Sequence, residues 1–467
     1  MNRPFHWRTR AAAAVVAALA LGVVAGCSSS SSSTTTAPTT STSSSTAVAS
    51  APASSSSASS TASASTVSTS SCGTKPGVAA TGTPINIGAI NTKQPGTDFS
   101  DIENMAGAYF ACVNANGGIN GHPIKFFPET EQTNPSQIAA LAKQLVTTDH
   151  VVGMMGNSSI IECSVDAAYW KSVGIDVLGA GIDPECYSTP NTASVNMGPR
   201  YSSDGAVQYV LAQGANKIAF DQSNVPGTAY IAAGPNAVAK AKGVPIQDFT
   251  ENVPITSANA IATKLVTAAG PSGAVVLNFT PPEALLILQA AQKLNLEDRV
   301  KYWACSTPCN TDFLATSLGP KWNGKLFVNA ELLPLDGNTS ATAQLFDAIL
   351  KQYGSDVSGG VGSFSEMGFT IAEIGTHALE SIKGPYTIAS VSAALEAVKD
   401  YNSGMLCQGY TYGSYPEHIP NNMDYTVTPD NGKFVEASSG GGCTLISASD
   451  PQIAAYRAVA GTAPMVG

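Results

Sequence analysis

Residues 85–90, with the sequence INIGAI, open the stretch that decides the fold. Their alternating β-branched side chains predict a strand. The sequence SDIE at residues 100–103 has the form of a capping box, and apolar residues at helical spacing follow it. Glycines in the segment NANGG at residues 114–118 supply left-handed conformations that end such a helix. We therefore expect a strand followed by an amphipathic helix.

A second strand, a second helix and a third strand follow directly. The second strand is expected at residues 124–127, and Asn134-Pro135 is typical of a helix start. The third strand is expected at residues 151–155 and stops at Gly156. This βαβαβ order is the half-unit of an open parallel sheet.

Strands and helices keep alternating along the rest of the chain. Further strands are expected at residues 175–179, 217–220, 246–249, 274–279 and 300–303. Ser202 is expected to cap one of the intervening helices. This alternation predicts an α/β fold with doubly wound parallel sheets, in which ligands bind beyond the carboxyl ends of the strands.

The N-terminal part carries a targeting signal instead of a folded core. Arg8 and Arg10 precede an apolar run at residues 11–24, which is too short for a permanent membrane span. The sequence VAGC at residues 24–27 resembles a lipobox, so we expect a signal peptide at residues 1–26 and a lipid on Cys27. Residues 27–83 are rich in Ser and Thr and are expected to form a disordered tether.

Chain length and net charge indicate the number of domains and exclude one kind of partner. A chain of 467 residues suggests two or more domains, and its formal net charge is −10. Because no basic run is present to follow a phosphate backbone, we expect no nucleic-acid partner.

Three short motifs resemble a known family. They are NANGGINGHPI at residues 114–124, EQTNP at residues 131–135, and the pair LV at residues 145–146 followed by Gly156. They resemble the first lobe of type I periplasmic binding proteins, especially the branched-chain amino-acid (Leu/Ile/Val)-binding family of ABC-transporter receptors. The resemblance runs from about residue 84 to about residue 435.

The resemblance implies two doubly wound lobes joined by a three-strand hinge, and residues 324–330 match the family's return strand into the first lobe. Lobe one would comprise residues 84–199 and 329–399, and lobe two residues 200–328 and 400–467. The implied function is an extracytoplasmic solute-binding protein of an ABC importer, anchored by its lipid to the outer face of the membrane. It would capture a small polar or amino-acid-like ligand by hinge closure and deliver it to a permease, acting as a monomer without a cofactor.

Two other functions stay open. One is a ligand-sensing module without a transport role, and the other is a secreted hydrolase. The sequence contains no G-x-S-x-G elbow, no Walker loop and no G-x-G-x-x-G motif, which counts against an enzyme.

The resemblance also implies a ligand site. In the family, hydroxyl and amide groups of two loops hold the ligand's carboxylate, and these loops correspond to Asn157, Ser158 and Ser159 and to Ala180 and Gly181. Position at strand ends adds further candidates, namely Gln94, Asp221, Tyr230 and Phe279. The serines can equally cap the next helix, and the aromatic residues can belong to the core.

Three departures from the family pattern bear on the ligand. Ile182 stands where Ser or Thr is usual, Pro226 replaces an aromatic residue, and no acid is evident near Thr307. These differences argue against an α-amino acid, whereas amides, urea-like molecules, small organic acids and aromatic acids remain possible ligands.

Eight cysteines remain besides Cys27, and an even number in an exported protein implies disulfides. Their places relative to the expected strands and helices suggest a specific pairing. The expected pairs are Cys163–Cys186, Cys305–Cys309, Cys407–Cys443 and Cys72–Cys112. The five histidines are scattered, so we expect no metal site.

Overall fold

The computed structural model describes residues 72–413, 418–437 and 442–461. The predicted signal peptide, the lipidation at Cys27 and residues 28–71 of the predicted tether lie outside these ranges. Among the described helices, none is long and apolar enough to cross a membrane.

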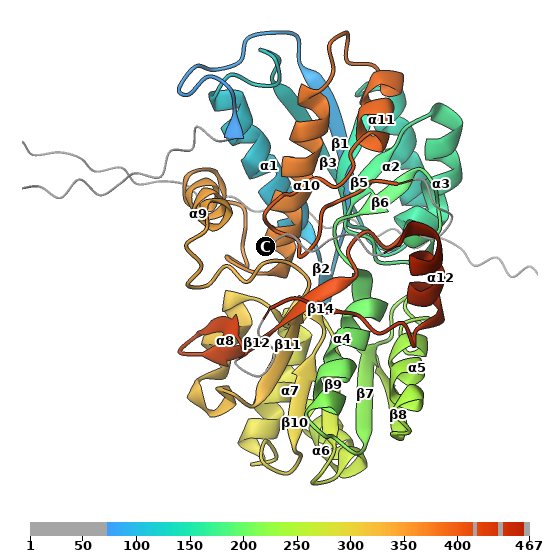
Figure 1. Cartoon of the computed structure of the whole chain (residues 1–467), viewed down its shortest axis with the longest axis vertical. Helices are drawn as coiled ribbons and strands as arrows, with labels where there is room; N and C mark the ends of the chain where they lie inside the picture. Colours follow the sequence, from blue (N-terminus) through green and yellow to red (C-terminus); the bar gives the residue numbers. More distant parts are fainter. Residues whose placement is uncertain (1–71, 414–417, 438–441, 462–467) are drawn as a thin grey trace, which may run out of the picture. The chain divides into compact units, whose positions relative to one another are not determined.

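The first sheet has a parallel core with one antiparallel strand at its edge (Figure 1). The strands follow the order β2-β1-β4-β5-β6, and β3 pairs with β1 in parallel register, with Ile85 opposite Ile124. The strand bounds are β1 (Ile85–Gln94), β2 (Thr97–Asp98), β3 (Ile124–Glu131), β4 (Gly153–Asn157), β5 (Val177–Gly179) and β6 (Thr192–Ser194).

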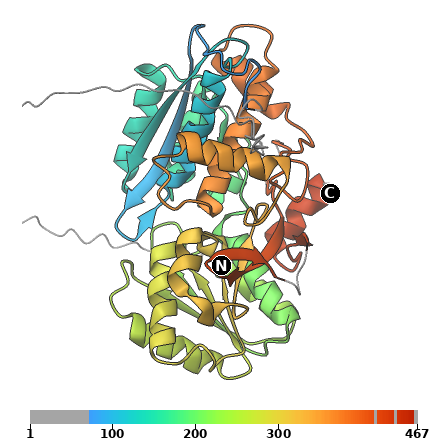
Figure 2. The ribbon, with the colours of Figure 1, turned by 90° about the vertical axis from the view of Figure 1, so that its left-hand side faces the viewer.

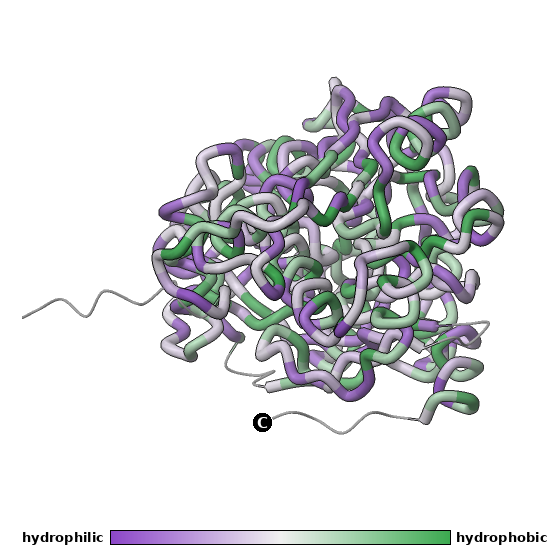
Figure 3. Tube along the Cα trace, turned by 90° about the horizontal axis from the view of Figure 1, so that it is seen from above, coloured by the Kyte–Doolittle hydropathy of each residue, from purple (hydrophilic) through white to green (hydrophobic). Residues whose placement is uncertain are grey.

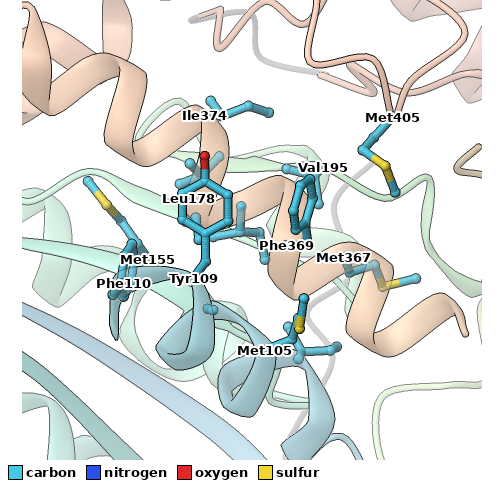
Figure 4. Packing of buried hydrophobic residues seen from close by; sticks show 14 of the residues in the cluster. Met105, Tyr109, Phe110, Met155, Leu178, Val195, Met367, Phe369, Ile374 and Met405 are labelled. Carbon is cyan, nitrogen blue, oxygen red and sulfur yellow. The ribbon is translucent and has the colours of Figure 1, made fainter. Parts of the chain in front are cut away.

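Helices pack against this sheet through an extensive apolar core. They are α1 (Ser100–Ala115), α2 (Pro135–Thr147), α3 (Glu162–Val173), α9 (Ala341–Tyr353), α10 (Ser363–Glu380) and α11 (Ile388–Glu396). α1 and α10 can approach closely because Gly368 of α10 has no side chain. A Cβ atom at this position would lie only 2.0 Å from the carbonyl oxygen of Ile102 in α1. Between these helices the rings of Tyr109 and Phe369 meet edge to face, with 5.2 Å between their centroids (Figure 4).

The second sheet combines five parallel strands with antiparallel strands at one edge. Its main order is β13-β12-β11-β10-β9-β7-β8, and β14 pairs with β12. The strand bounds are β7 (Ile218–Ser223), β8 (Ile246–Glu251), β9 (Ala274–Asn278), β10 (Tyr302–Cys305), β11 (Leu326–Ala330), β12 (Met423–Asp430), β13 (Lys433–Glu436) and β14 (Thr444–Leu445).

Helices cover the second sheet as well (Figure 2). They are α4 (Gly198–Ala212), α5 (Ala233–Ala241), α6 (Ala258–Ala269), α7 (Pro281–Lys293) and α8 (Asp312–Leu318), with 3-10 turns η3 (Thr307–Cys309) and η4 (Pro320–Trp322). The 3-10 turn η2 (Pro184–Tyr187) follows β5 of the first sheet, and it shares an apolar cluster with α12 (Pro451–Ala460). Hydrophilic and hydrophobic residues alternate along the trace, as expected of amphipathic elements (Figure 3). The predicted α/β fold with two doubly wound sheets is thus confirmed.

The chain passes between the two sheets three times. It leaves the first sheet between β6 and α4, returns after β11, and enters the second sheet again at β12. Met405, Leu406, Tyr410 and Tyr412 pack in the same apolar cluster as β1 and α1. We therefore propose that lobe one extends to about residue 412, instead of ending at residue 399.

Some predicted helix starts are wrong. Ser100 does not cap α1, because it is the first helical residue and both its N–H and its hydroxyl donate to Asp98 Oδ1, at 2.9 and 2.6 Å. Ser202 lies inside α4, which begins at Gly198 with Pro199 in its first turn. The cap at Asn134 is confirmed, since its side chain accepts the N–H groups of Ser136 and Gln137.

Several elements were not predicted, namely the helices α8, α9 and α12, the short strands β2 and β6, and the antiparallel strands β12, β13 and β14. The C-terminal part is rich in Gly and Asn, which hides the strand pattern. β12 pairs there with β11, and β13 and β14 pair with β12.

The structure brings the four predicted cysteine pairs to disulfide distance. The Cα–Cα distances are 6.0 Å for Cys72–Cys112, 5.2 Å for Cys163–Cys186, 6.0 Å for Cys305–Cys309 and 5.8 Å for Cys407–Cys443. The second pair ties the start of α3 to η2, two segments that follow neighbouring strands of the first sheet.

Replacing Cys163 and Cys186 together with Ala is expected to lower the free energy of unfolding by about 2–4 kcal/mol, because the bond restricts the unfolded chain. The Cys305–Cys309 disulfide closes a loop of only 4 residues, whereas Cys163–Cys186 closes one of 23. Replacing Cys305 and Cys309 with Ala should therefore lower the free energy of unfolding by less. Denaturant titration measures both effects, and non-reducing peptide mapping tests the pairing. Free thiols at Cys163 and Cys186 would contradict it.

Candidate ligand-binding site

Two cavities lie between the first and second sheets. We call them the inner cavity, of about 70 Å³, and the outer cavity, of about 480 Å³. Thr97, Thr280 and Phe364 line both, so the two spaces adjoin. They lie where the parallel strands of both sheets end, which is the expected position for a ligand in doubly wound folds.

The first-sheet wall of the inner cavity is mostly apolar. Phe99 and Ile102 come from the start of α1, Ile160 precedes α3, Ile182 follows β5, and Met367 comes from α10. The helical periodicity of α1 and α10 points Ile102 and Met367 inward, and both are at most 3% exposed. This wall suits an apolar body.

The second-sheet wall continues this apolar lining. Phe279 directly follows β9 and is 1% exposed, and the segment between β7 and α5 contributes Val225, Thr228 and Ile231. The side-chain amide of Asn278 already has protein partners, because its Nδ2 donates to Pro199 O at 3.0 Å and to Ser203 Oγ at 2.7 Å. Ligand contact from this wall is therefore mainly through apolar surface.

Glu331 is the one ionisable side chain among the described residues that line the inner cavity. It follows β11 at the point where the chain returns to the first sheet, and it is 2% exposed. Its Oε2 accepts the backbone N–H of Met197 at 2.5 Å. Burial raises the pKa of Glu331 to about 8, although the N–H groups of Met197 and Gly198 oppose that shift.

The carboxylate of Glu331 connects the first and second crossings of the chain, because it accepts the N–H of Met197. Asn421, which lies on the third crossing, is hydrogen-bonded to both of the others. The Nδ2 of Asn421 donates to Glu331 O at 2.8 Å and to Val195 O at 3.2 Å. A buried set of hydrogen bonds therefore connects the three segments that run between the sheets. These segments form the hinge that the sequence predicts.

The outer cavity is more polar. Its first-sheet wall includes Gln94, Asp98 and Asp101, and its second-sheet wall includes Glu283. The hydroxyl of Thr280 donates to Gly96 O at 3.0 Å and so connects the two walls. The outer cavity is consequently the more hydrophilic side of the cleft.

Direct contacts between the walls indicate that the cleft is closed. The hydroxyl of Tyr230 donates to the carbonyl oxygen of Ile182. Gly227 adopts a left-handed conformation, with φ of 82°, and a Cβ atom there would lie 3.1 Å from Ile161 Cγ2. The loop after β7 therefore touches the loop before α3.

Three of the nine predicted site residues line a cavity. Gln94 lines the outer cavity, and Ala180 and Phe279 line the inner cavity. The other six line neither: Asn157, Ser158, Ser159, Gly181, Asp221 and Tyr230.

Four of these six residues form hydrogen bonds within the first-sheet lobe. The hydroxyl of Ser159 donates to Glu131 Oε1 at 2.8 Å, and Ser158 N–H donates to Ile90 O at 2.9 Å. Asn157 O accepts Ala180 N–H at 2.8 Å, and Gly181 N–H donates to Ser194 Oγ at 3.0 Å. The Ser159 hydroxyl and the N–H groups of Ser158 and Gly181 thus already have protein partners, whereas the Ser158 hydroxyl and the Asn157 side-chain amide have none among the described residues.

The remaining two lie on the second-sheet side. Asp221 is fully buried within β7, and burial raises its pKa to about 7. Tyr230 contributes the cleft-closing hydrogen bond to Ile182 instead of lining the cavities.

The sequence prediction missed Glu331, Phe364 and Met367. A signal for Glu331 was available, because it directly follows a predicted strand end, the same position that suggested Asp221 and Phe279. Phe364 and Met367 come from α10, which follows the second crossing, so only the tertiary fold shows that they reach the cleft.

One group of potential metal ligands lies near this region, formed by Cys163, Asp183 and Cys186. The two cysteines are the disulfide pair, and Asp183 accepts N–H groups of Ser164 and Glu185 at 3.0 and 2.9 Å. These engagements fit a structural role for the group.

Comparisons with known proteins place this fold. The family model described as periplasmic binding protein matches residues 84–432. No protein among the curated sequences matches.

Solved structures agree with the family match. A branched-chain amino acid ABC transporter protein from Thermus thermophilus with bound valine superposes with a TM-score of 0.69 at 15% identity, covering 80% of this chain and 99% of that one. A fatty acid ABC transporter substrate-binding protein from Thermomonospora curvata gives 0.64 at 16% identity, with coverages of 81% and 95%. A solute-binding protein from Rhodopseudomonas palustris HaA2 in complex with p-hydroxybenzoic acid gives 0.64 at 15%, with coverages of 78% and 98%.

The two α/β sheets, the hinge and the enclosed cleft define a type I periplasmic binding fold. The chain belongs to the periplasmic binding protein family, and is therefore a solute-binding receptor.

The raised pKa values at the hinge make stability depend on pH. Burial raises the pKa of Glu331 to about 8 and that of Asp424 to about 8, whereas unfolded carboxyl groups titrate near about 4. Between these values the folded chain binds more protons than the unfolded chain, so stability falls as pH rises. The melting temperature should be higher near about pH 5 than near about pH 8.

Glu331→Gln should reduce this difference, because it removes one of the titrating groups. The same substitution at the exposed Glu185 serves as the control. Differential scanning calorimetry across the pH range measures the effect. A pH dependence unchanged by Glu331→Gln would show that Glu331 titrates normally in the folded chain.

Proposed function

We propose that this protein is the substrate-binding component of an ABC importer, and a receptor instead of an enzyme. It encloses one small molecule in the inner cavity when the two lobes close about the hinge. The closed form is then recognised by a permease in the membrane. The observation that carries the proposal is the buried, mostly apolar cavity between the strand ends of two sheets, in a chain of this family.

The similar structures support an importer role. The Thermus, Thermomonospora and Rhodopseudomonas proteins are each named as ABC transporter components, and their named ligands are valine, fatty acid and p-hydroxybenzoic acid. These molecules share an apolar portion, which agrees with the apolar walls around Phe279 and Ile160.

The N-terminal sequence supports a place at the outer face of the cell membrane. A lipid on Cys27 would hold the receptor next to its permease, while the Ser/Thr-rich residues 28–71 would let the folded part reach it. We propose that the protein acts there as a monomer.

A thermal-shift screen of small metabolites tests the receptor function. A ligand that binds only the folded chain raises its melting temperature. Phe279→Ala should weaken binding of the identified ligand by about tenfold or more, because the ring forms part of the cavity wall.

Phe220→Ala is the matched control, because Phe220 is equally buried in the second sheet but does not line either cavity. Both variants should be less stable than the parent chain, and isothermal titration calorimetry below their melting temperatures separates affinity from stability. Equal affinity in the Phe279 variant and the control would refute this placement of the ligand.

The anchor is tested by Cys27→Ser, which removes the thiol that would carry the lipid. The variant should leave the membrane fraction and enter the aqueous phase of a detergent partition, whereas Ser28→Ala should not change the distribution. A Cys27→Ser protein that stays in the detergent phase would exclude the lipid as the anchor.

A further inference from the structure

The inner cavity has an unusual balance of charge for a receptor of small carboxylates. Its walls are built mainly from Phe, Ile, Val, Met and Pro side chains, and its one described ionisable residue is an acid, Glu331. The nearby Arg200 points elsewhere, because its Nε and Nη2 donate to the two carboxylate oxygens of Asp450 at 2.6 and 3.0 Å. An anion in this cavity would meet a carboxyl group and no countercharge from the described lining.

The backbone donors that would suit an anion are also engaged. Ile160 N–H donates to Thr92 Oγ1 at 2.9 Å, and Gly181 N–H donates to Ser194 Oγ at 3.0 Å. The Ser159 hydroxyl is bound to Glu131, and the Ser158 hydroxyl, which has no hydrogen-bond partner in the described part of the chain, does not line the inner cavity. A carboxylate that took the Ile160 or Gly181 N–H or the Ser159 hydroxyl would have to break a buried hydrogen bond, which is costly to leave unmade.

The outer cavity carries the same sign of charge. Asp98, Asp101 and Glu283 line it, and no Lys, Arg or His occurs among its described lining residues. Only Asp98 has a basic partner, Lys93 at 3.2 Å, whereas Asp101 and Glu283 accept backbone N–H groups of Gly359 and Ile255. A cation approaching the inner cavity therefore passes favourable charges, and an anion passes unfavourable ones.

We propose that the ligand is an apolar amine without a carboxylate group, whose ammonium lies against Glu331 while its hydrocarbon part fills the inner cavity. This inference rests on the proposed receptor function and names its substrate class. The ammonium compensates the buried carboxylate, and the carbon skeleton contacts the apolar walls.

The position of Glu331 connects this ligand to closure. A carboxylate paired with an ammonium is held in its charged form, and hydrogen bonds that it accepts are then charge-assisted and stronger. One of these is the bond from Met197 N–H at the first crossing of the chain. The ligand would thus reinforce the contact between two crossing segments at the moment when the lobes enclose it.

The test uses the full-length chain and compounds that share one skeleton. Isopentylamine, leucine and isocaproate form one series, and phenethylamine, phenylalanine and hydrocinnamate form a second. Isopentanol adds an uncharged member. In calorimetric titration we expect at least one amine to bind, with an affinity about tenfold or more above that of its amino acid, its acid and the alcohol.

Glu331→Gln should lower the affinity for that amine by about tenfold or more, because the amide keeps an acceptor for Met197 but loses the charge. Glu373→Gln is the matched control, because Glu373 is another acid whose carboxylate accepts a hydrogen bond, from the hydroxyl of Tyr401 at 3.3 Å. Glu373 lines neither cavity. If Glu331→Gln does not fold, the two compound series on the parent chain still decide the question.

The outcomes separate this inference from the receptor function. Tighter binding of leucine, phenylalanine, either acid or the alcohol than of the amines overturns the amine class, as does an unchanged affinity in Glu331→Gln. If neither amine binds but the metabolite screen yields an anionic or uncharged ligand, the class is wrong and the receptor function stands; if it yields another amine, the class stands. If no compound of either experiment binds, the receptor function itself fails.

Discussion

The architecture depends on a small set of buried hydrogen bonds where the chain crosses between its two sheets. Glu331 accepts the N–H of Met197, and Asn421 donates to the carbonyl oxygens of Glu331 and Val195. Three segments far apart in sequence are therefore held together at one place. Because the same crossings flank the strand ends of both sheets, this hinge fixes the position of the cleft, and it places a carboxyl group in the cavity wall.

Much of the fold follows from local sequence signals. The strand predicted at residues 274–279 corresponds to β9, and Asn134 caps α2 as its side-chain chemistry suggests. The capping box at Ser100 failed because Asp98, two residues earlier, competes for the same N–H group. The antiparallel strand β12 was missed because its pairing partner, β11, lies about a hundred residues earlier in the chain, and β13 and β14 pair in turn with β12.

The site was harder to predict than the fold. Position at strand ends identified Gln94 and Phe279, and the family resemblance identified Ala180. Neither could show that Ser159 is bound to Glu131 or that Gly181 is bound to Ser194. Such engagements arise from packing between loops and have no sequence period. The same limit applies to Glu331, whose role depends on a long-range contact with Met197. Resemblance to a family thus located the cleft, whereas the chemistry of its walls required the structure.

The central claim is that one ligand is enclosed by walls from both sheets. Hydrogen exchange of the full-length chain, measured with and without the ligand found by screening, tests it most directly. The account predicts slower exchange on ligand binding in both residues 97–102 of the first-sheet wall and residues 279–283 of the second-sheet wall, since both line the cavities. Slower exchange in only one of these segments, or in neither, would contradict closure around the ligand.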